Sequence, residues 1–83
     1  MLSVRITATV QSDLWDHPRV VWLDWVHPIT GSPGHIRREL EHGSDWEDSD
    51  NWIAQATAAV VSSIDAGGEP GGKELVLDYR HWR

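Results

Sequence analysis

The chain has 83 residues, a net charge of −6 from 13 acidic and 7 basic side chains, and no cysteine. This length leaves no room for a second hydrophobic core, the missing thiols exclude disulfides and cysteine-ligated zinc, and the negative charge disfavours a phosphate backbone as a partner. No apolar run approaches the length of about 18 residues that a membrane span needs. We therefore predict a single domain, 1–83, that is cytoplasmic, has no cofactor, and binds neither nucleic acid directly nor a membrane.

The first part of the sequence predicts two strands. Residues 3–10 alternate between apolar and polar side chains, which is typical of a strand with one buried face. Residues 11–18 are polar, contain a proline and predict a connection. Residues 19–26 are rich in valine and tryptophan and predict a second strand that is largely apolar on both faces.

The next stretch fits two predictions. Residues 27–34 contain two prolines and two glycines and predict a turn. Residues 35–42 fit a strand with Ile36 and Leu40 facing inward, and they also fit a helix that Ser32 caps. We favour the strand.

Residues 44–66 have the pattern of an amphipathic helix. Ser44 and Glu47 have the spacing of a capping box, with a later start capped by Ser49 or Asp50 as the alternative. Apolar and small side chains recur at helical spacing on one side, at Ile53, Ala56, Thr57, Val60, Val61 and Ile64.

The end of the sequence predicts a turn and a last strand. Gly67 and Gly68 end the helix, residues 69–72 form a loop, and residues 74–82 alternate as a strand does. The order is β-β-(β)-α-β. We predict an α+β fold in which a small antiparallel sheet of three or four strands carries one helix packed on one face.

One helix can cover one face of such a sheet and leaves the other uncovered. We expect the covered face to hold Val4, Ile6, Ala8, Val21, Leu23, Trp25, Leu75, Leu77 and Tyr79. The opposite face then presents Arg5, Thr7, Thr9, Val20, Trp22, Asp24, Asp78, Arg80 and Trp82.

The six tryptophans are more than one amphipathic helix can shield. Burying one indole removes about 150–250 Å² from water, and Trp and Arg are enriched in interface hot spots. The uncovered face therefore predicts an interface with a protein partner or a second copy, as a homodimer, made by Trp22, Trp82, Arg80, Arg5, Asp24 and Val20. Alternatively the chain covers this face itself, with a loop carrying Trp15 or with the start of the helix carrying Trp46.

Acidic residues crowd the stretch that leads into the helix. As a secondary hypothesis they form a docking strip for a basic partner, made by Glu39, Glu41, Asp45, Glu47, Asp48 and Asp50. A solvated helix N-terminus whose acids match the helix dipole explains the same run. The spacing does not fit a calcium loop, which needs a glycine at its sixth position.

Motifs for catalysis and metal binding are incomplete. Residues 67–73 match the string GxxxxGK, but Glu74 stands where a phosphate-binding loop needs Ser or Thr, and the loop follows a helix rather than a strand. No G-x-S-x-G elbow is present. The five histidines are His17, His27, His35, His42 and His81. None of them has the spacing to another histidine that a metal site on a helix needs, so we predict no metal site.

These observations together predict a non-catalytic protein-binding module, of the kind found among inhibitors, immunity proteins and phage-encoded proteins that modulate a host. Two alternatives stay open. The protein could be a structural homo-oligomer that buries the same sheet face. It could instead be a small ligand-binding protein or metal-dependent enzyme whose histidines and acids converge in a cleft.

Overall fold

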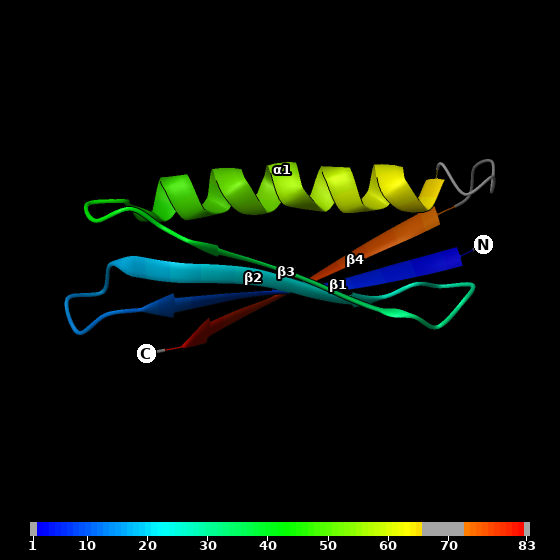
Figure 1. The fold of residues 1–83 in the computed structure, drawn as a ribbon, viewed down its shortest axis with the longest axis horizontal. Helices are drawn as coiled ribbons and strands as arrows, with labels where there is room; N and C mark the ends of the chain where they lie inside the picture. Colours follow the sequence, from blue (N-terminus) through cyan, green and yellow to red (C-terminus); the bar gives the residue numbers. More distant parts are fainter. Residues whose placement is uncertain (1, 66–72, 83) are drawn as a thin grey trace.

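The computed structural model describes residues 2–65 and 73–82, which form two layers, one helix on a four-stranded sheet (Figure 1). The elements are β1 (Leu2–Ser12), β2 (Pro18–Val26), β3 (Pro33–Glu39), α1 (Trp46–Asp65) and β4 (Lys73–Trp82). The predicted α+β class and element order are confirmed. The strand predicted over 35–42 is also confirmed, although it ends at Glu39.

The order of strands in the sheet is β3-β2-β1-β4. The pairs β1–β2 and β2–β3 are antiparallel, as predicted, whereas β4 pairs with β1 in parallel, so the sheet is mixed. The difference follows from the connection. Hairpins reverse the chain between β1, β2 and β3, but β3 and β4 are joined through α1, and a helical crossover returns the chain in its original direction.

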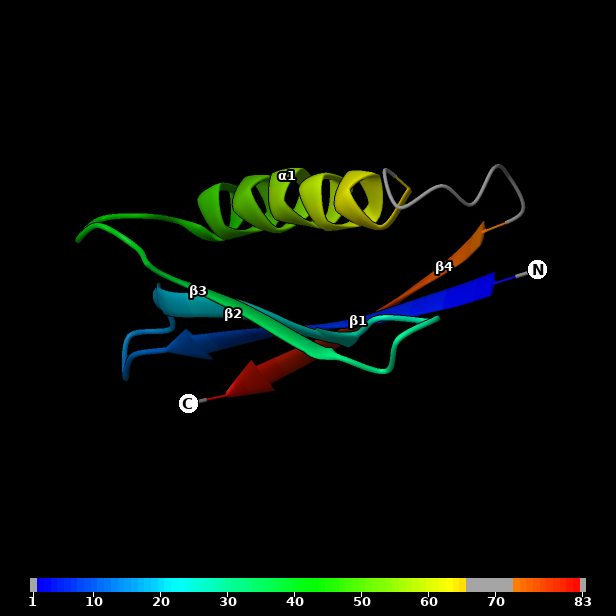
Figure 2. The ribbon, with the colours of Figure 1, turned by 45° about the vertical axis from the view of Figure 1, so that its right-hand side comes forward.

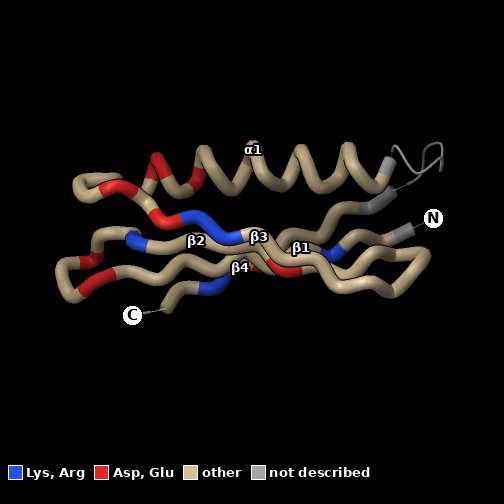
Figure 3. The backbone as a smooth tube through the Cα atoms, viewed as in Figure 1, with Lys and Arg blue, Asp and Glu red and all other residues tan. Residues whose placement is uncertain are grey.

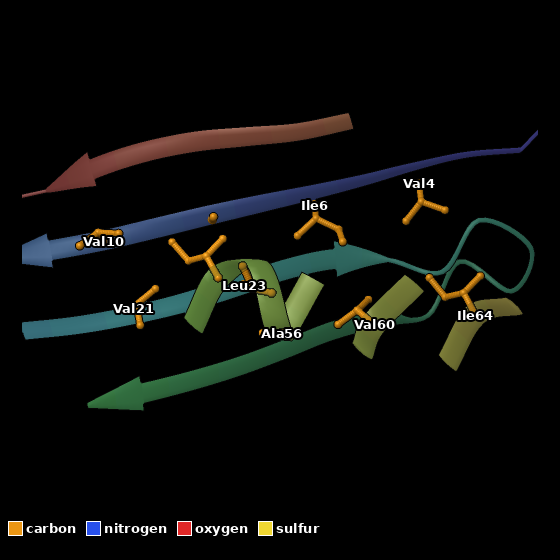
Figure 4. Packing of buried hydrophobic residues seen from close by; sticks show 10 residues of the cluster. Val4, Ile6, Val10, Val21, Leu23, Ala56, Val60 and Ile64 are labelled. Carbon is orange, nitrogen blue, oxygen red and sulfur yellow. The ribbon is translucent and has the colours of Figure 1, made fainter. Parts of the chain in front are cut away.

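The hydrophobic core lies between α1 and the two central strands. Strand alternation points Val4, Ile6, Ala8 and Val10 of β1, and Val21 and Leu23 of β2, toward the helix (Figure 4). The apolar stripe of α1 supplies Ile53, Ala56, Val60 and Ile64. The period-two and helical patterns of the sequence therefore identify the buried set of these three elements.

The helix begins one residue later than the predicted Ser44 and Glu47 capping box requires. Asp45 is the N-cap: its carboxylate accepts the N–H of Asp48 at 2.9 Å, and the Asp48 carboxylate accepts the N–H of Asp45 at 3.0 Å. Two aspartates at this spacing satisfy the same two amides as a Ser and Glu pair. The indole N–H of Trp46 donates to the Asp16 carbonyl at 2.8 Å, which ties the start of α1 to the β1–β2 turn.

The apolar side chains of β4 were predicted to lie under the helix, and this prediction is wrong. Leu75, Leu77 and Tyr79 are 46%, 38% and 54% exposed. They face the helix layer, because they pair with Val4, Ile6 and Ala8, but α1 lies over β2 and β1 and meets β4 through the side-chain contacts of Asp50 with Tyr79 and of Trp46 with His81. A helix is about 10–12 Å across and four strand axes span about 14–15 Å, so one helix leaves an edge strand uncovered.

Trp25 needs a glycine on the neighbouring strand. It pairs with Gly34 of β3, and a Cβ on Gly34 would lie only 2.1 Å from a ring carbon of Trp25. The half-buried indole therefore occupies the space that a side chain at position 34 would fill.

We expect Gly34→Ala to lower the free energy of unfolding by about 1–3 kcal/mol, because the methyl group must displace the indole. Urea denaturation measures the change. In a Trp25→Val background the same substitution should cost much less, and an equal cost in both backgrounds would show that the indole is not the cause.

Thr57 lies on the buried side of α1, and its hydroxyl has no hydrogen-bond partner among the described residues. We expect Thr57→Val to raise the free energy of unfolding by about 1 kcal/mol, because it removes an unpaired buried hydroxyl at nearly constant volume. Thr57→Ser is the control, since it keeps the hydroxyl and loses the methyl group. A valine variant less stable than the natural protein in urea would contradict this account.

Candidate functional site

The six residues predicted to form an interface share one face of the sheet. Because the alternate residues of β1 and β2 point into the core, their neighbours point the other way, and α1 covers only the core side (Figure 2). We call the uncovered side the open face. It carries Arg5, Val20, Trp22, Asp24, Arg80 and Trp82, as the sequence pattern predicts.

The strand register arranges the open face in rows that cross all four strands. One row runs from β3 to β4 as Arg37, Trp22, Thr9 and Arg80. The next row contains His35, Asp24, Thr7 and Asp78. An aromatic and cationic row thus lies beside a row with two carboxylates.

Two indoles meet on this face. The ring centroids of Trp22 and Trp82 are 6.4 Å apart and the rings are nearly perpendicular, at 88°. Thr9 lies on β1 between their strands and is buried. Trp82 is 62% exposed and Trp22 is half-buried, so the described chain does not enclose this pair.

Neither of the two segments that could have covered the open face does so. Trp15, in the turn between β1 and β2, is 76% exposed. Trp46 lies on the helix side of the sheet, where its ring packs edge-on against His81 with 4.9 Å between centroids. Neither tryptophan therefore contributes to shielding the Trp22 and Trp82 pair in the described part of the chain.

The open face is hollowed at two adjoining places. A hollow of about 350 Å³ is lined by Thr7, Thr9, Trp22, Asp24, Arg80 and Trp82. A wider one of about 790 Å³ shares Thr7 and Asp24 with it, includes Arg5, and extends under the β2–β3 turn to Ile29. Volumes of this size accommodate the side chains of a partner, and both hollows are open to solvent.

Most charges on the open face are paired within the chain. Arg5 Nε is 3.6 Å from the Asp78 carboxylate, and Asp24 is 2.6 Å from Nδ1 of His35. Arg37 contacts Glu39 at 3.3 Å. Arg80 is exposed and has no ion-pair or hydrogen-bond partner among the residues that the structure describes. An unpaired guanidinium therefore lies beside the two indoles.

The acidic strip lies mainly at one end of the molecule, where the start of α1 is close to the β1–β2 turn (Figure 3). Four of its members have partners within the chain. Asp45 and Asp48 cap α1, Asp50 accepts a hydrogen bond from Tyr79, and Glu39 pairs with Arg37. The other two, Glu41 and Glu47, are exposed. Helix capping and strand packing thus account for most of the strip.

A cluster that sequence reasoning missed lies on the helix side, at the end of β1. The Ser12 hydroxyl is 2.8 Å from Nε2 of His81, and the same nitrogen is 3.9 Å from the Asp16 carboxylate. In a catalytic triad the acid binds the ring nitrogen opposite the one that faces the serine. Here both groups face one nitrogen and Ser12 is buried. This cluster joins β1, β4 and the turn, and only the parallel register of Val10 with His81 reveals it.

The remaining histidines are dispersed. His27 Nδ1 accepts the N–H groups of Ile29 and Thr30 within the β2–β3 turn, and His42 Nδ1 is 3.1 Å from the Arg19 guanidinium. Within 2–65 and 73–82, no group of three or more His, Asp or Glu side chains is placed to hold a metal ion. The GxxxxGK string at 67–73 lies largely outside the described residues.

The only tyrosine of the chain links β4 to α1. Its hydroxyl donates to the Asp50 carboxylate at 3.1 Å. Partial removal of the hydroxyl from water and its contact with the anionic Asp50 raise the pKa of Tyr79 from 10.0 to about 12. The protonated phenol is the form that the folded chain favours.

No protein-family model matches the chain, and no curated protein and no solved structure matches it. Among the residues described, no helix combines the length and the apolar character needed to cross a membrane.

We expect the single tyrosine to titrate near pH 12 in the folded protein, followed by absorbance at 295 nm. Since the folded pKa exceeds the unfolded value, this contact stabilises the fold below about pH 10 and is lost as the pH rises through about 12. Asp50→Asn should lower the midpoint, and chain unfolded in urea should titrate near 10. A midpoint that Asp50→Asn leaves unchanged would show that the carboxylate does not contact the phenol.

Proposed function

We propose that the protein is a non-catalytic protein-binding module that docks a partner protein on its open face. The observation that carries the proposal is the pair of incompletely buried indoles, Trp22 and Trp82, in a hollow of the open face. Arg80 beside them has no partner among the described residues, and none of the described elements covers this face. Aromatic residues and arginine dominate the hot spots of protein interfaces, where they gain most from exclusion of water.

The lining of the hollow indicates what a partner must offer. The indole walls favour an apolar side chain, and the Arg80 guanidinium favours a carboxylate or carbonyl acceptor next to it. Thr7 also lines the hollow and can donate or accept a hydrogen bond. The best-fitting partner segment carries an apolar side chain followed closely by an acceptor.

Net charge affects the approach of a partner rather than its fit. With a charge of −6, the chain attracts a partner that is positive overall, and this attraction acts over about a Debye length. The exposed Glu41 and Glu47 and the acids of the α1 cap contribute to this field. We assign the acidic strip this steering role and place the contact itself on the open face.

A binding role also agrees with the Ser12–His81 arrangement better than a hydrolytic role does. A serine nucleophile needs a histidine nitrogen that accepts its proton, with the acid on the far side of the ring. The Nε2 atom of His81 faces both Ser12 and Asp16, so the acid is not on the far side of the ring as that mechanism requires. The cluster then serves to hold the end of β4 against β1.

We expect Trp82→Ala to weaken partner binding by about 30-fold or more, the effect of losing a hot-spot side chain. Wild type, Trp82→Ala and the control Trp15→Ala are immobilised and exposed to extract of the source organism. A protein retained by wild type and control but lost by Trp82→Ala is then purified, and its Kd for all three is measured by calorimetry. Trp15 is a matched control because it is equally aromatic, more exposed, and outside the open-face hollows.

Circular dichroism must first show that both variants keep the fold, which the exposure of both side chains leads us to expect. Equal Kd values for wild type and Trp82→Ala would place the partner elsewhere and overturn the proposal. The absence of any protein whose retention depends on Trp82 would overturn it as well.

A further inference from the structure

The two edges of the sheet differ in how they are protected from pairing with another strand. The β3 edge begins with Pro33 and carries four exposed polar or charged side chains in its seven residues, His35, Arg37, Arg38 and Glu39. Proline and charge are the usual means by which proteins block edge-to-edge pairing. The β4 strand has ten residues and contains neither proline nor glycine, and among the described strands it pairs with β1 alone.

Exposed apolar side chains follow the β4 edge. Leu75, Leu77 and Tyr79 lie on its helix side and are exposed, although the Tyr79 hydroxyl reaches Asp50 of α1. Trp82 lies at the end of its open-face side. A long edge strand with such side chains is a template for another strand, because its outward N–H and C=O groups lack partners within the sheet.

We propose that β4 pairs in antiparallel fashion with β4 of a second copy, about a two-fold axis at Leu77, and so joins two four-stranded sheets into one. The proposal does not depend on partner binding at the open face. An axis perpendicular to the sheet keeps both helices on one side and both open faces on the other.

The sequence of β4 is self-complementary in this register, in which the numbers of opposed residues sum to 154. Leu77 of one copy opposes Leu77 of the other, and Leu75 opposes Tyr79, so the exposed apolar strips meet side by side. On the open-face side of the strand, Asp78 opposes Val76. Apolar side chains therefore meet on the helix side of the axis, and on the other side each Asp78 opposes Val76 rather than a second carboxylate.

Two-fold pairing is also a closed arrangement. It pairs the β4 edges of both copies with each other, so the two β3 edges are the edges that stay exposed. The charged side chains of β3 disfavour pairing with a further strand. Pairing of β4 with β3 of the next copy would instead repeat without end and produce fibres. The contrast between the two edges thus favours a dimer.

Light scattering coupled to size exclusion tests the dimer. We expect wild type at twice the 9.4 kDa chain mass, and Leu77→Lys at the mass of one chain, because two lysines would oppose each other at the axis. Leu14→Lys is the control: Leu14 is at least as exposed but lies in the β1–β2 turn, so this variant should stay dimeric. Wild type that is monomeric over the concentration range, or a Leu77→Lys variant that stays dimeric, overturns the proposal.

Single cysteines test the register, since the chain has no cysteine of its own. Opposed residues of an antiparallel pair have Cα atoms about 4.5–5.5 Å apart, within the disulfide range of about 4.4–6.8 Å. Leu77→Cys should therefore form a disulfide-linked dimer on mild oxidation. Tyr79→Cys should not, because the two copies of position 79 lie about 13 Å apart along the strands. Cross-linking at 79 and not at 77 would overturn this register.

The failure of this proposal and of the proposed function can be told apart. A Leu77→Lys monomer that still binds an open-face partner supports both. Loss of partner binding in Trp82→Ala while the Leu77→Cys dimer persists shows that the two surfaces act independently. Far-ultraviolet circular dichroism tests whether each β4 variant is folded. If Leu77→Lys does not fold, disulfide formation by Leu77→Cys still tests whether the dimer exists.

Discussion

The structure depends on the mismatch between one helix and four strands. A helix covers about two strands of a sheet, and α1 lies over β1 and β2, where it closes the core with Ile53, Ala56, Val60 and Ile64. The parts of the sheet that α1 does not cover are partly or fully exposed to solvent. The open face and the β4 edge are both consequences of this width.

The two uncovered regions have different chemistry. The open face combines two indoles, internally paired charges and Arg80, which has no partner among the described residues, and on this composition rests our proposal that it binds a partner protein. The β4 edge combines Leu75, Leu77 and Tyr79 with backbone groups that no other described strand pairs, and on this combination rests our proposal that it pairs with another strand. Trp82 and Arg80 lie on β4 and belong to the open face, so the C-terminal strand contributes to both.

The acidic residues at one end of the molecule lie among polar contacts that hold the fold together. Asp45 and Asp48 cap α1, Trp46 ties its start to the Asp16 carbonyl, and Ser12 and His81 join β1 to β4 beneath it. Several strands and the helix start are thereby fastened together by polar contacts outside the hydrophobic core. These contacts within the fold account for the polar residues at this end of the molecule, and no ligand is needed to explain them.

Much of the architecture follows from local patterns in the sequence. The period-two alternation of β1 and β2 and the helical spacing from Ile53 to Ile64 determine these elements and the core that they share. The same alternation places Trp22, Arg80 and Trp82 on one face, and the surplus of tryptophans draws attention to that face. Alternation and helical spacing are properties of neighbouring residues, so they can be recognised without coordinates. The parallel pairing of β4, the exposure of Leu75, Leu77 and Tyr79, and the contact of Ser12 with His81 were decided only in three dimensions. They depend on which strands the helix crosses and how far its width extends, and no local spacing encodes either.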